Sequence, residues 1–114
     1  MRIQPIIYTH DSPRSVAWYS KVLEVEPSHV SEMWSTFDVG GATLAIHKVD
    51  GDLPPESRVA ISLVAAEPLE KLIERWSSIP EIEILRGIED EAFGRSLLLS
   101  DPDATVIQVN EHTS

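Results

Sequence analysis

The sequence predicts an α+β domain made of two βαβββ repeats, in which the helices cover the outer face of a curved mixed sheet. Two stretches carry this prediction: IIYTHDSPRSVAWYSKVL at 6–23 and ISLVAAEPLEKLIERW at 61–76. Each runs from an apolar strand-like segment, through an acidic residue and a proline, into a helix-like pattern. The acidic residues, Asp11 and Glu67, lie about half of the 114-residue chain apart. Two copies of so long a unit indicate an internal duplication, because a solenoid needs three or more repeats.

A helix is expected after each acidic residue. In the first, Ser12 suits the N-cap and Pro13 the first helical position, and three apolar residues share one face: Val16, Tyr19 and Leu23. In the second, Pro68 opens the helix, and the i, i+3, i+4, i+7 spacing aligns Leu69, Leu72, Ile73 and Trp76. Trp18 and Trp76 are expected in the core because both lie on these helices.

Three short strands are expected after each helix. They are about 28–31, 33–39 and 42–48 in the first half, with a hairpin at Gly40-Gly41. In the second half they are about 82–86, 95–100 and 104–110, with DPDA (101–104) as the final turn. The acidic stretch GIEDEAF (87–93) is expected to be a loop. One domain of 1–114 follows, with repeat 1 at about 1–49, a linker at about 50–57 and repeat 2 at about 58–114.

Alternation along the strands separates two faces of the sheet. Leu44 and Ile46 point to one side, which must meet the helices, whereas Thr43, Ala45 and His47 point to the other. A sheet covered by helices on one face leaves a semi-polar cup on the other, and this composition is typical of a small-molecule site. The predicted lining is Gln4, Ile6, Tyr8, Trp34, Thr36, Thr43, His47, Arg58, Ser62, Ser96, Leu98 and Gln108. Trp34 is the candidate for stacking on a ligand, with dimer or edge packing as its alternative role.

Composition narrows the class of partner. Nineteen acidic and nine basic residues give a net charge of −10, which disfavours nucleic acid and anionic lipid and suits a cationic ligand. The absence of cysteine excludes disulfides and fits a reducing cytoplasm, where we expect the protein. No apolar run approaches the length of a membrane span.

Four motifs resemble the glyoxalase/bleomycin-resistance/extradiol-dioxygenase (vicinal oxygen chelate) superfamily. They are the strand ending in Asp11, SVAWYSKVL, VGGATLAIHK and FGRSLLLSDPDATVIQVNE, in the same order and over nearly the whole chain. The chain departs from the family at Glu24 and Ala104, which stand where glycine is usual. A positive φ at Ala104 would be strained. The resemblance implies a homodimer.

The resemblance also implies where a metal would be held. The family's inward His, Glu or Gln ligands correspond here to Gln4, Ala45, Arg58 and Gln108. Ala45 offers no donor atom, and the guanidinium of Arg58 has no lone pair and carries a positive charge that repels a cation. Arg58 is therefore expected to grip an anionic group or to pair with a carboxylate such as Asp38. We expect no metal and no cofactor, and only a weak catalytic candidate in His47.

The leading interpretation is a metal-free protein that binds or sequesters a drug-like or metabolite ligand in the cup, as in antibiotic resistance. The alternative is a lyase, isomerase or dioxygenase of the same superfamily with an atypical metal site. The sequence does not decide whether the protein is an enzyme, although the residues at the metal positions argue against it. A non-catalytic interaction subunit is a third interpretation.

Overall fold

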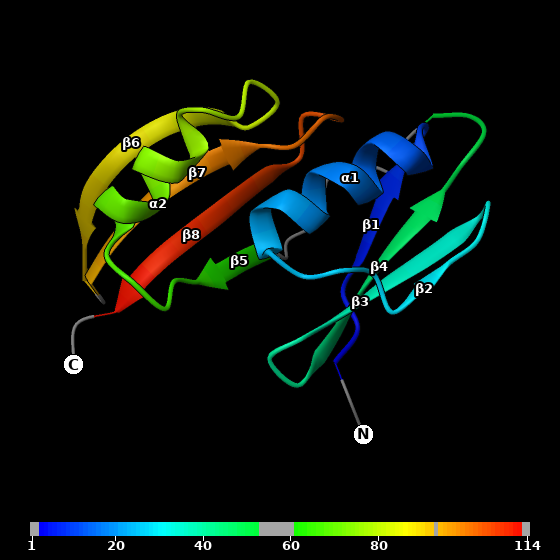
Figure 1. Cartoon of the computed structure of the whole chain (residues 1–114), viewed down its shortest axis with the longest axis horizontal. Helices are drawn as coiled ribbons and strands as arrows, with labels where there is room; N and C mark the ends of the chain where they lie inside the picture. The colour runs from blue at the N-terminus through cyan, green and yellow to red at the C-terminus, as the bar shows by residue number, and fades with distance from the viewer. Residues whose placement is uncertain (1–2, 53–60, 93, 113–114) are drawn as a thin grey trace. The chain divides into compact units, whose positions relative to one another are not determined.

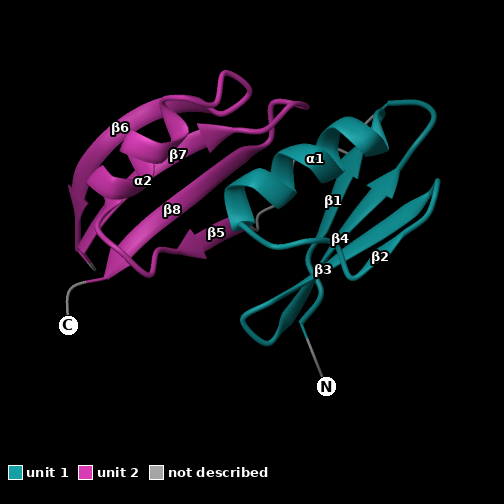
Figure 2. Ribbon diagram, in the orientation of Figure 1, with its two compact units in different colours: residues 1–56 teal, residues 57–114 magenta. Residues whose placement is uncertain are grey.

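The computed structural model describes residues 3–52, 61–92 and 94–112, and the chain divides into two compact units, Met1–Glu56 and Ser57–Ser114 (Figure 2). Unit 1 contains β1 (Ile6–Thr9), α1 (Ser12–Leu23), β2 (His29–Val30), β3 (Trp34–Val39) and β4 (Ala42–Lys48). Unit 2 contains β5 (Ile61–Val64), α2 (Leu69–Trp76), β6 (Glu83–Glu91), β7 (Gly94–Ser100) and β8 (Val106–His112). The predicted order, βαβββ twice, is confirmed (Figure 1).

Each unit has its own four-stranded mixed sheet with the same topology. The strand orders are β1-β4-β3-β2 in unit 1 and β5-β8-β7-β6 in unit 2. In each case the first strand pairs in parallel with the last, and the other pairs are antiparallel. Gly40 and Gly41 join β3 to β4 with φ values of 54° and 86°, which is the left-handed backbone that a two-residue hairpin requires.

The core of unit 1 lies between its sheet and α1. Ile7, Phe37, Leu44 and Ile46 point to this side and are at most 8% exposed. The helix contributes Trp18, Tyr19 and Val22, with Ser12 and Ser15 buried beside them. The Ser15 hydroxyl lies 2.7 Å from that of Thr9, so these buried polar groups satisfy each other.

The structure corrects the predicted start and face of α1. Asp11 is the N-cap, accepting a hydrogen bond from the Arg14 backbone N–H at 3.1 Å, and Ser12 is the first helical residue. Val16 and Leu23 are only half-buried, because the buried stripe runs through the two serines instead. The helix ends at Glu24, which adopts φ 58° and ψ 38°, so the left-handed stop is kept without glycine.

The core of unit 2 repeats this plan with α2. Leu69, Leu72 and Trp76 from the helix are buried, as are sheet residues Leu97, Leu99, Ile107 and Val109. The predicted core positions of Trp18 and Trp76 are therefore confirmed, with exposed fractions of 2% and 4%. Among the described residues, neither helix has the length and apolar character needed to cross a bilayer.

The prediction that the acidic stretch 87–93 forms a loop is wrong in part, because residues 87–91 belong to strand β6. Glu89 pairs with Ser96, Asp90 with Arg95 and Glu91 with Gly94, after two register shifts around Arg86. These bulges let β6 continue past Gly87 while it stays paired with β7 in a hairpin. The turn after β7 is organised by Asp101, whose Oδ1 accepts hydrogen bonds from the N–H groups of Asp103 and Thr105.

Candidate functional site

The face of the unit 1 sheet opposite α1 carries a row of three aromatic side chains. Tyr8, His47 and Trp34 are direct cross-strand neighbours on β1, β4 and β3. The His47 ring lies 5.8 Å from the Tyr8 ring and 5.6 Å from the Trp34 ring, in edge-to-face contacts with interplanar angles of 62° and 60°. All three are half-buried. His47 is also held through Nδ1, which lies 3.0 Å from the carbonyl oxygen of Met33. We call these three residues the aromatic row.

The neighbouring positions on this face are small or apolar. Ile6, Ala45 and Thr36 form the next cross-strand row, and Ala45 at its centre is fully buried. Thr43 lies one step further and donates a hydrogen bond to Asp38 at 3.3 Å. Gln4 precedes β1 and is exposed. This face therefore carries three aromatic rings beside a flatter surface of small and apolar side chains.

The corresponding face of unit 2 carries a mixed row. Ser62, Gln108 and Leu98 are cross-strand neighbours on β5, β8 and β7, and Leu98 is opposite Arg86 on β6. The Gln108 amide donates a hydrogen bond to Asn110 Oδ1 at 2.8 Å. Ser96 is fully buried near this row. The predicted residues Ser62, Leu98 and Gln108 therefore lie together, while Arg58 lies outside the described residues.

Sequence reasoning missed Arg86, which anchors a polar network on the open face of unit 2. Its Nη2 donates a hydrogen bond to the Ser96 hydroxyl at 2.6 Å, and that hydroxyl donates to Glu91 Oε1 at 2.9 Å. Arg86 Nη1 also lies 3.1 Å from a Glu89 carboxylate oxygen. A bulge just before Arg86 turns it toward this face, and a strict alternation count cannot anticipate a bulge. Arg86 thus offsets part of the negative charge of the acidic stretch 87–93.

A second charged cluster lies where α2 begins. Arg95 binds Glu70 through two hydrogen bonds of 2.7 and 2.8 Å and Glu111 through two of 2.8 and 2.9 Å. The hydrogen bonds from Arg95 lower the pKa of Glu70 from 4.5 to about 2 and lower the pKa of Glu111 below its usual value. Glu111 also accepts the Leu69 backbone N–H at 3.0 Å, which ties the helix to β8. This cluster is structural, because its groups satisfy one another.

The residues at the family's metal positions do not fit a divalent ion. Ala45 has no donor atom, and the Gln108 amide nitrogen donates to Asn110, which leaves only its carbonyl oxygen to face a cation. Gln4 and Gln108 each offer one neutral carbonyl oxygen, whereas zinc and hard cations favour imidazole or anionic oxygen ligands. Among the described residues, no group of three histidine, aspartate or glutamate side chains is arranged to hold a metal.

Comparisons with known proteins agree with the motif resemblance. No protein-family model matches the chain. The phenazine antibiotic resistance protein EhpR of Enterobacter agglomerans is 27% identical over 111 residues, covering 91% of this chain and 86% of that protein.

Solved structures with the same fold cover almost the whole chain. A glyoxalase/bleomycin resistance protein from Catenulispora acidiphila has a TM-score of 0.73 at 23% identity, covering 99% of each chain. A lactoylglutathione lyase from Agrobacterium tumefaciens also has a TM-score of 0.73, at 18% identity, covering 97% of this chain and 92% of that one. The chain therefore has the glyoxalase/bleomycin-resistance fold, and the resemblance indicated by its motifs is confirmed.

Proposed function

We propose that this protein binds a planar aromatic small molecule on the open face of its first sheet and sequesters it without a metal ion. The observation that carries this proposal is the aromatic row of Tyr8, His47 and Trp34. Aromatic faces attract flat conjugated molecules by dispersion and quadrupole interactions, and such pairs contribute about 0.5–1.5 kcal/mol beyond simple burial. The distant relative named for phenazine resistance supports the same ligand class, because phenazines are flat heteroaromatic compounds.

The geometry of the row suits a single planar guest. Strands in a sheet are about 4.8 Å apart, so Tyr8 and Trp34, on either side of β4, are separated by about 9.6 Å at the backbone. One aromatic layer needs about 3.5–4 Å on each face. The His47 ring lies between the two flanking rings, so we propose that a flat molecule lies across the aromatic row and not between Tyr8 and Trp34. The buried Ala45 beside His47 adds no bulk that would block it.

Charge supports a neutral or cationic guest. The chain carries a net charge of −10, which raises the local concentration of cations and lowers that of anions. The second open face, with Ser62 and Gln108, offers neutral hydrogen-bonding groups of the kind that orient a ligand in a mostly apolar site. On unit 1 we propose Gln4 and Thr43 as further contacts of this ligand, whereas Ser62, Leu98 and Gln108 are proposed ligand contacts on the separate open face of unit 2. Ser96 on that face is fully buried and bound to Arg86 and Glu91, and the contact predicted at Arg58 lies outside the described residues.

Fluorescence titration with phenazine tests the proposal. Trp34 is half-buried while Trp18 and Trp76 are in the core, so a ligand on the open face quenches mainly Trp34. We expect saturable quenching in wild type. Because Trp34→Leu removes the main reporter, its affinity is read by calorimetry. We expect Tyr8→Leu and Trp34→Leu each to raise Kd by about 2- to 13-fold, the equivalent of the stacking energy.

Two controls make this result specific. Met33→Leu changes the exposed neighbour of Trp34 along the chain, and its Kd for phenazine should equal that of wild type. Exhaustive treatment with a chelator should also leave Kd unchanged. Binding that disappears with the chelator and returns with zinc, nickel, manganese or iron would replace this proposal with the metalloenzyme alternative.

We further infer that the protein works as a homodimer. Ile3, Ile6 and Val64 are 78%, 39% and 67% exposed, which is unusual for large aliphatic side chains near a sheet edge. Light scattering coupled to size-exclusion chromatography should give twice the chain mass of 12.7 kDa. A monomeric mass across the micromolar range would contradict the inference.

A further inference from the structure

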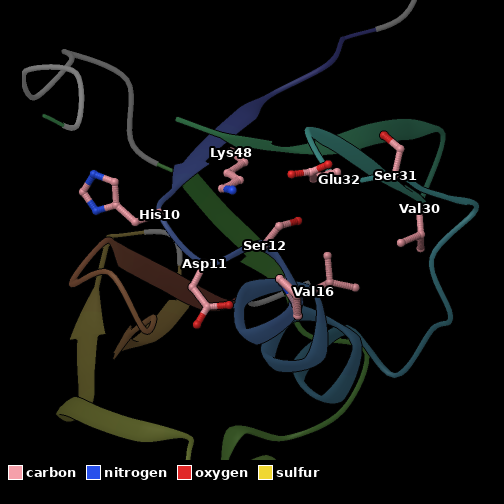
Figure 3. A pocket seen from close by; sticks show the side chains of 9 residues that line it. His10, Asp11, Ser12, Val16, Val30, Ser31, Glu32 and Lys48 are labelled. Atoms are coloured by element: carbon pink, nitrogen blue, oxygen red, sulfur yellow. The ribbon is translucent and has the colours of Figure 1, made fainter. Parts of the chain in front are cut away.

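Unit 1 contains a pocket on the opposite side of its sheet from the aromatic row. Its volume is about 630 Å³, and its lining comes from the end of β1, the first turn of α1, the segment between β2 and β3, and the end of β4 (Figure 3). The lining residues are His10, Asp11, Ser12, Pro13, Val16, Val30, Ser31, Glu32 and Lys48. All of them lie in the described part of unit 1.

The pocket follows from the width of the sheet. A helix with its side chains is about 10–12 Å across, whereas four strands span about 19 Å, so one helix covers about half of the sheet. The edge strand β2 is left beyond α1 (Figure 1). Val30 is opposite the buried Ser35 in the β2–β3 register, yet it is 61% exposed. Val30, Pro13 and Val16 thus provide an apolar wall without a partner.

One buried polar group points to a ligand. Ser12 is only 4% exposed and lines the pocket, and within the described residues its hydroxyl has no hydrogen-bond partner. Among the described residues no buried side-chain nitrogen or oxygen atom lacks a hydrogen-bond partner, so the Ser12 hydroxyl oxygen is not sealed in the core but is open to the pocket. The Ser12 hydroxyl is not used to cap α1, because the Asp11 side chain accepts the hydrogen bond from the Arg14 N–H. The Ser12 hydroxyl therefore remains available to a molecule in the pocket.

Two opposite charges accompany this hydroxyl. Lys48 and Glu32 both line the pocket, and neither forms an ion pair with any residue that the structure describes. Figure 3 shows both side chains in the part of the pocket that also contains Ser12. Asp11 is occupied as the helix cap, and His10 is bound to the carbonyl oxygen of Gly51. The unused groups are one ammonium, one carboxylate and one hydroxyl, beside an apolar wall.

From this arrangement we infer that the pocket binds a small zwitterion of the α-amino-acid type with an apolar side chain. Its carboxylate accepts hydrogen bonds from Lys48 and Ser12, and its ammonium donates to Glu32. Its side chain packs on Pro13, Val16 and Val30. Charge-assisted hydrogen bonds of this kind are the stronger ones, so both charges of the ligand are needed for binding. The site is independent of the proposed aromatic-ligand site, because the two lie on opposite faces of the sheet.

Titration of ¹⁵N-labelled full-length protein with L-leucine tests the inference. We expect saturable shifts confined to residues 10–16, 30–32 and 48. Two probes remove one charge each: 4-methylpentanoate lacks the ammonium, and isopentylamine lacks the carboxylate. Both should bind at least about tenfold more weakly than L-leucine, since a hydrogen bond to a charged group contributes that much or more.

Variants then assign the contacts. Glu32 is exposed and Lys48 half-buried, so Glu32→Gln and Lys48→Met should fold normally and raise the Kd for L-leucine at least about tenfold. Ser12→Ala should raise it about 2- to 10-fold. Glu26→Gln, an exposed change away from the pocket, is the matched control and should leave Kd unchanged. The inference is overturned if L-leucine produces no saturable shifts, if a single-charge probe binds equally well, or if the shifts fall on Tyr8, Trp34 and His47.

Discussion

Replacing Ala104 by glycine should stabilise the protein, although most substitutions do the opposite. Ala104 adopts φ 64° in the turn before β8, where the Cβ of an L-residue crowds the following carbonyl oxygen. This left-handed conformation costs about 1–2 kcal/mol. Glycine relieves it but adds about 0.4–1 kcal/mol of unfolded-state entropy. Because Ala104 is exposed, no packing is lost, and the net gain is about 0.5–1 kcal/mol.

Thermal unfolding followed by circular dichroism measures this gain. An unfolding entropy of about 2.1 cal/mol/K per residue over the chain converts 0.5–1 kcal/mol into a rise in Tm of about 2–4 °C. Ala17→Gly is the matched control, since Ala17 is also exposed but lies inside α1 with helical backbone. The same chemical change there should cost about 1 kcal/mol and lower Tm by about 4 °C. If Ala104→Gly has a Tm equal to or below that of wild type, the strain argument is refuted.

Three further predictions concern charge, packing and capping. Glu70→Gln should lower the free energy of unfolding above pH 4.5. Because Arg95 lowers the pKa of folded Glu70 from 4.5 to about 2, the difference from wild type should shrink as pH falls through this interval and vanish below it, and a pH-independent difference in urea denaturation would contradict the pairing. Phe37→Ala empties a fully buried site and should cost about 3–5 kcal/mol in the same assay, whereas a cost under about 1 kcal/mol would mean that the core collapses around it. Asp11→Ala removes the acceptor of the Arg14 N–H and should cost about 1 kcal/mol, and an unchanged unfolding midpoint would show that another group caps α1.

Periodicity was enough to predict the fold and the facing of the strands in unit 1. Strict alternation placed Leu44 and Ile46 toward the helix and His47 away from it, and the structure has them so, because the strands of unit 1 carry no recorded register shift. The same reasoning does not extend to β6, where two shifts in register break the period of two and bring Arg86 onto the open face.

Other misses have a different physical origin. The face of α1 was predicted from apolar residues alone, but Ser12 and Ser15 are buried, and Ser15 is tolerated there through its bond to Thr9. The pocket beside α1 could not be predicted, because it depends on how much of the sheet one helix covers and on which charges remain unpaired. Propensity describes residues one at a time, whereas these features belong to groups of residues from distant parts of the chain.

The parallel pairing of β1 with β4 has a consequence for biosynthesis. The paired residues Thr9 and Lys48 are separated by 39 residues in the chain, so β1 is translated well before its partner strand. At about 5–20 residues per second, it waits about 2–8 s before β4 has been translated. All four strands of the unit 1 sheet lie within the first 48 residues, so they have been translated before unit 2 begins. The nascent chain can therefore complete its first module while the remaining codons are still being read.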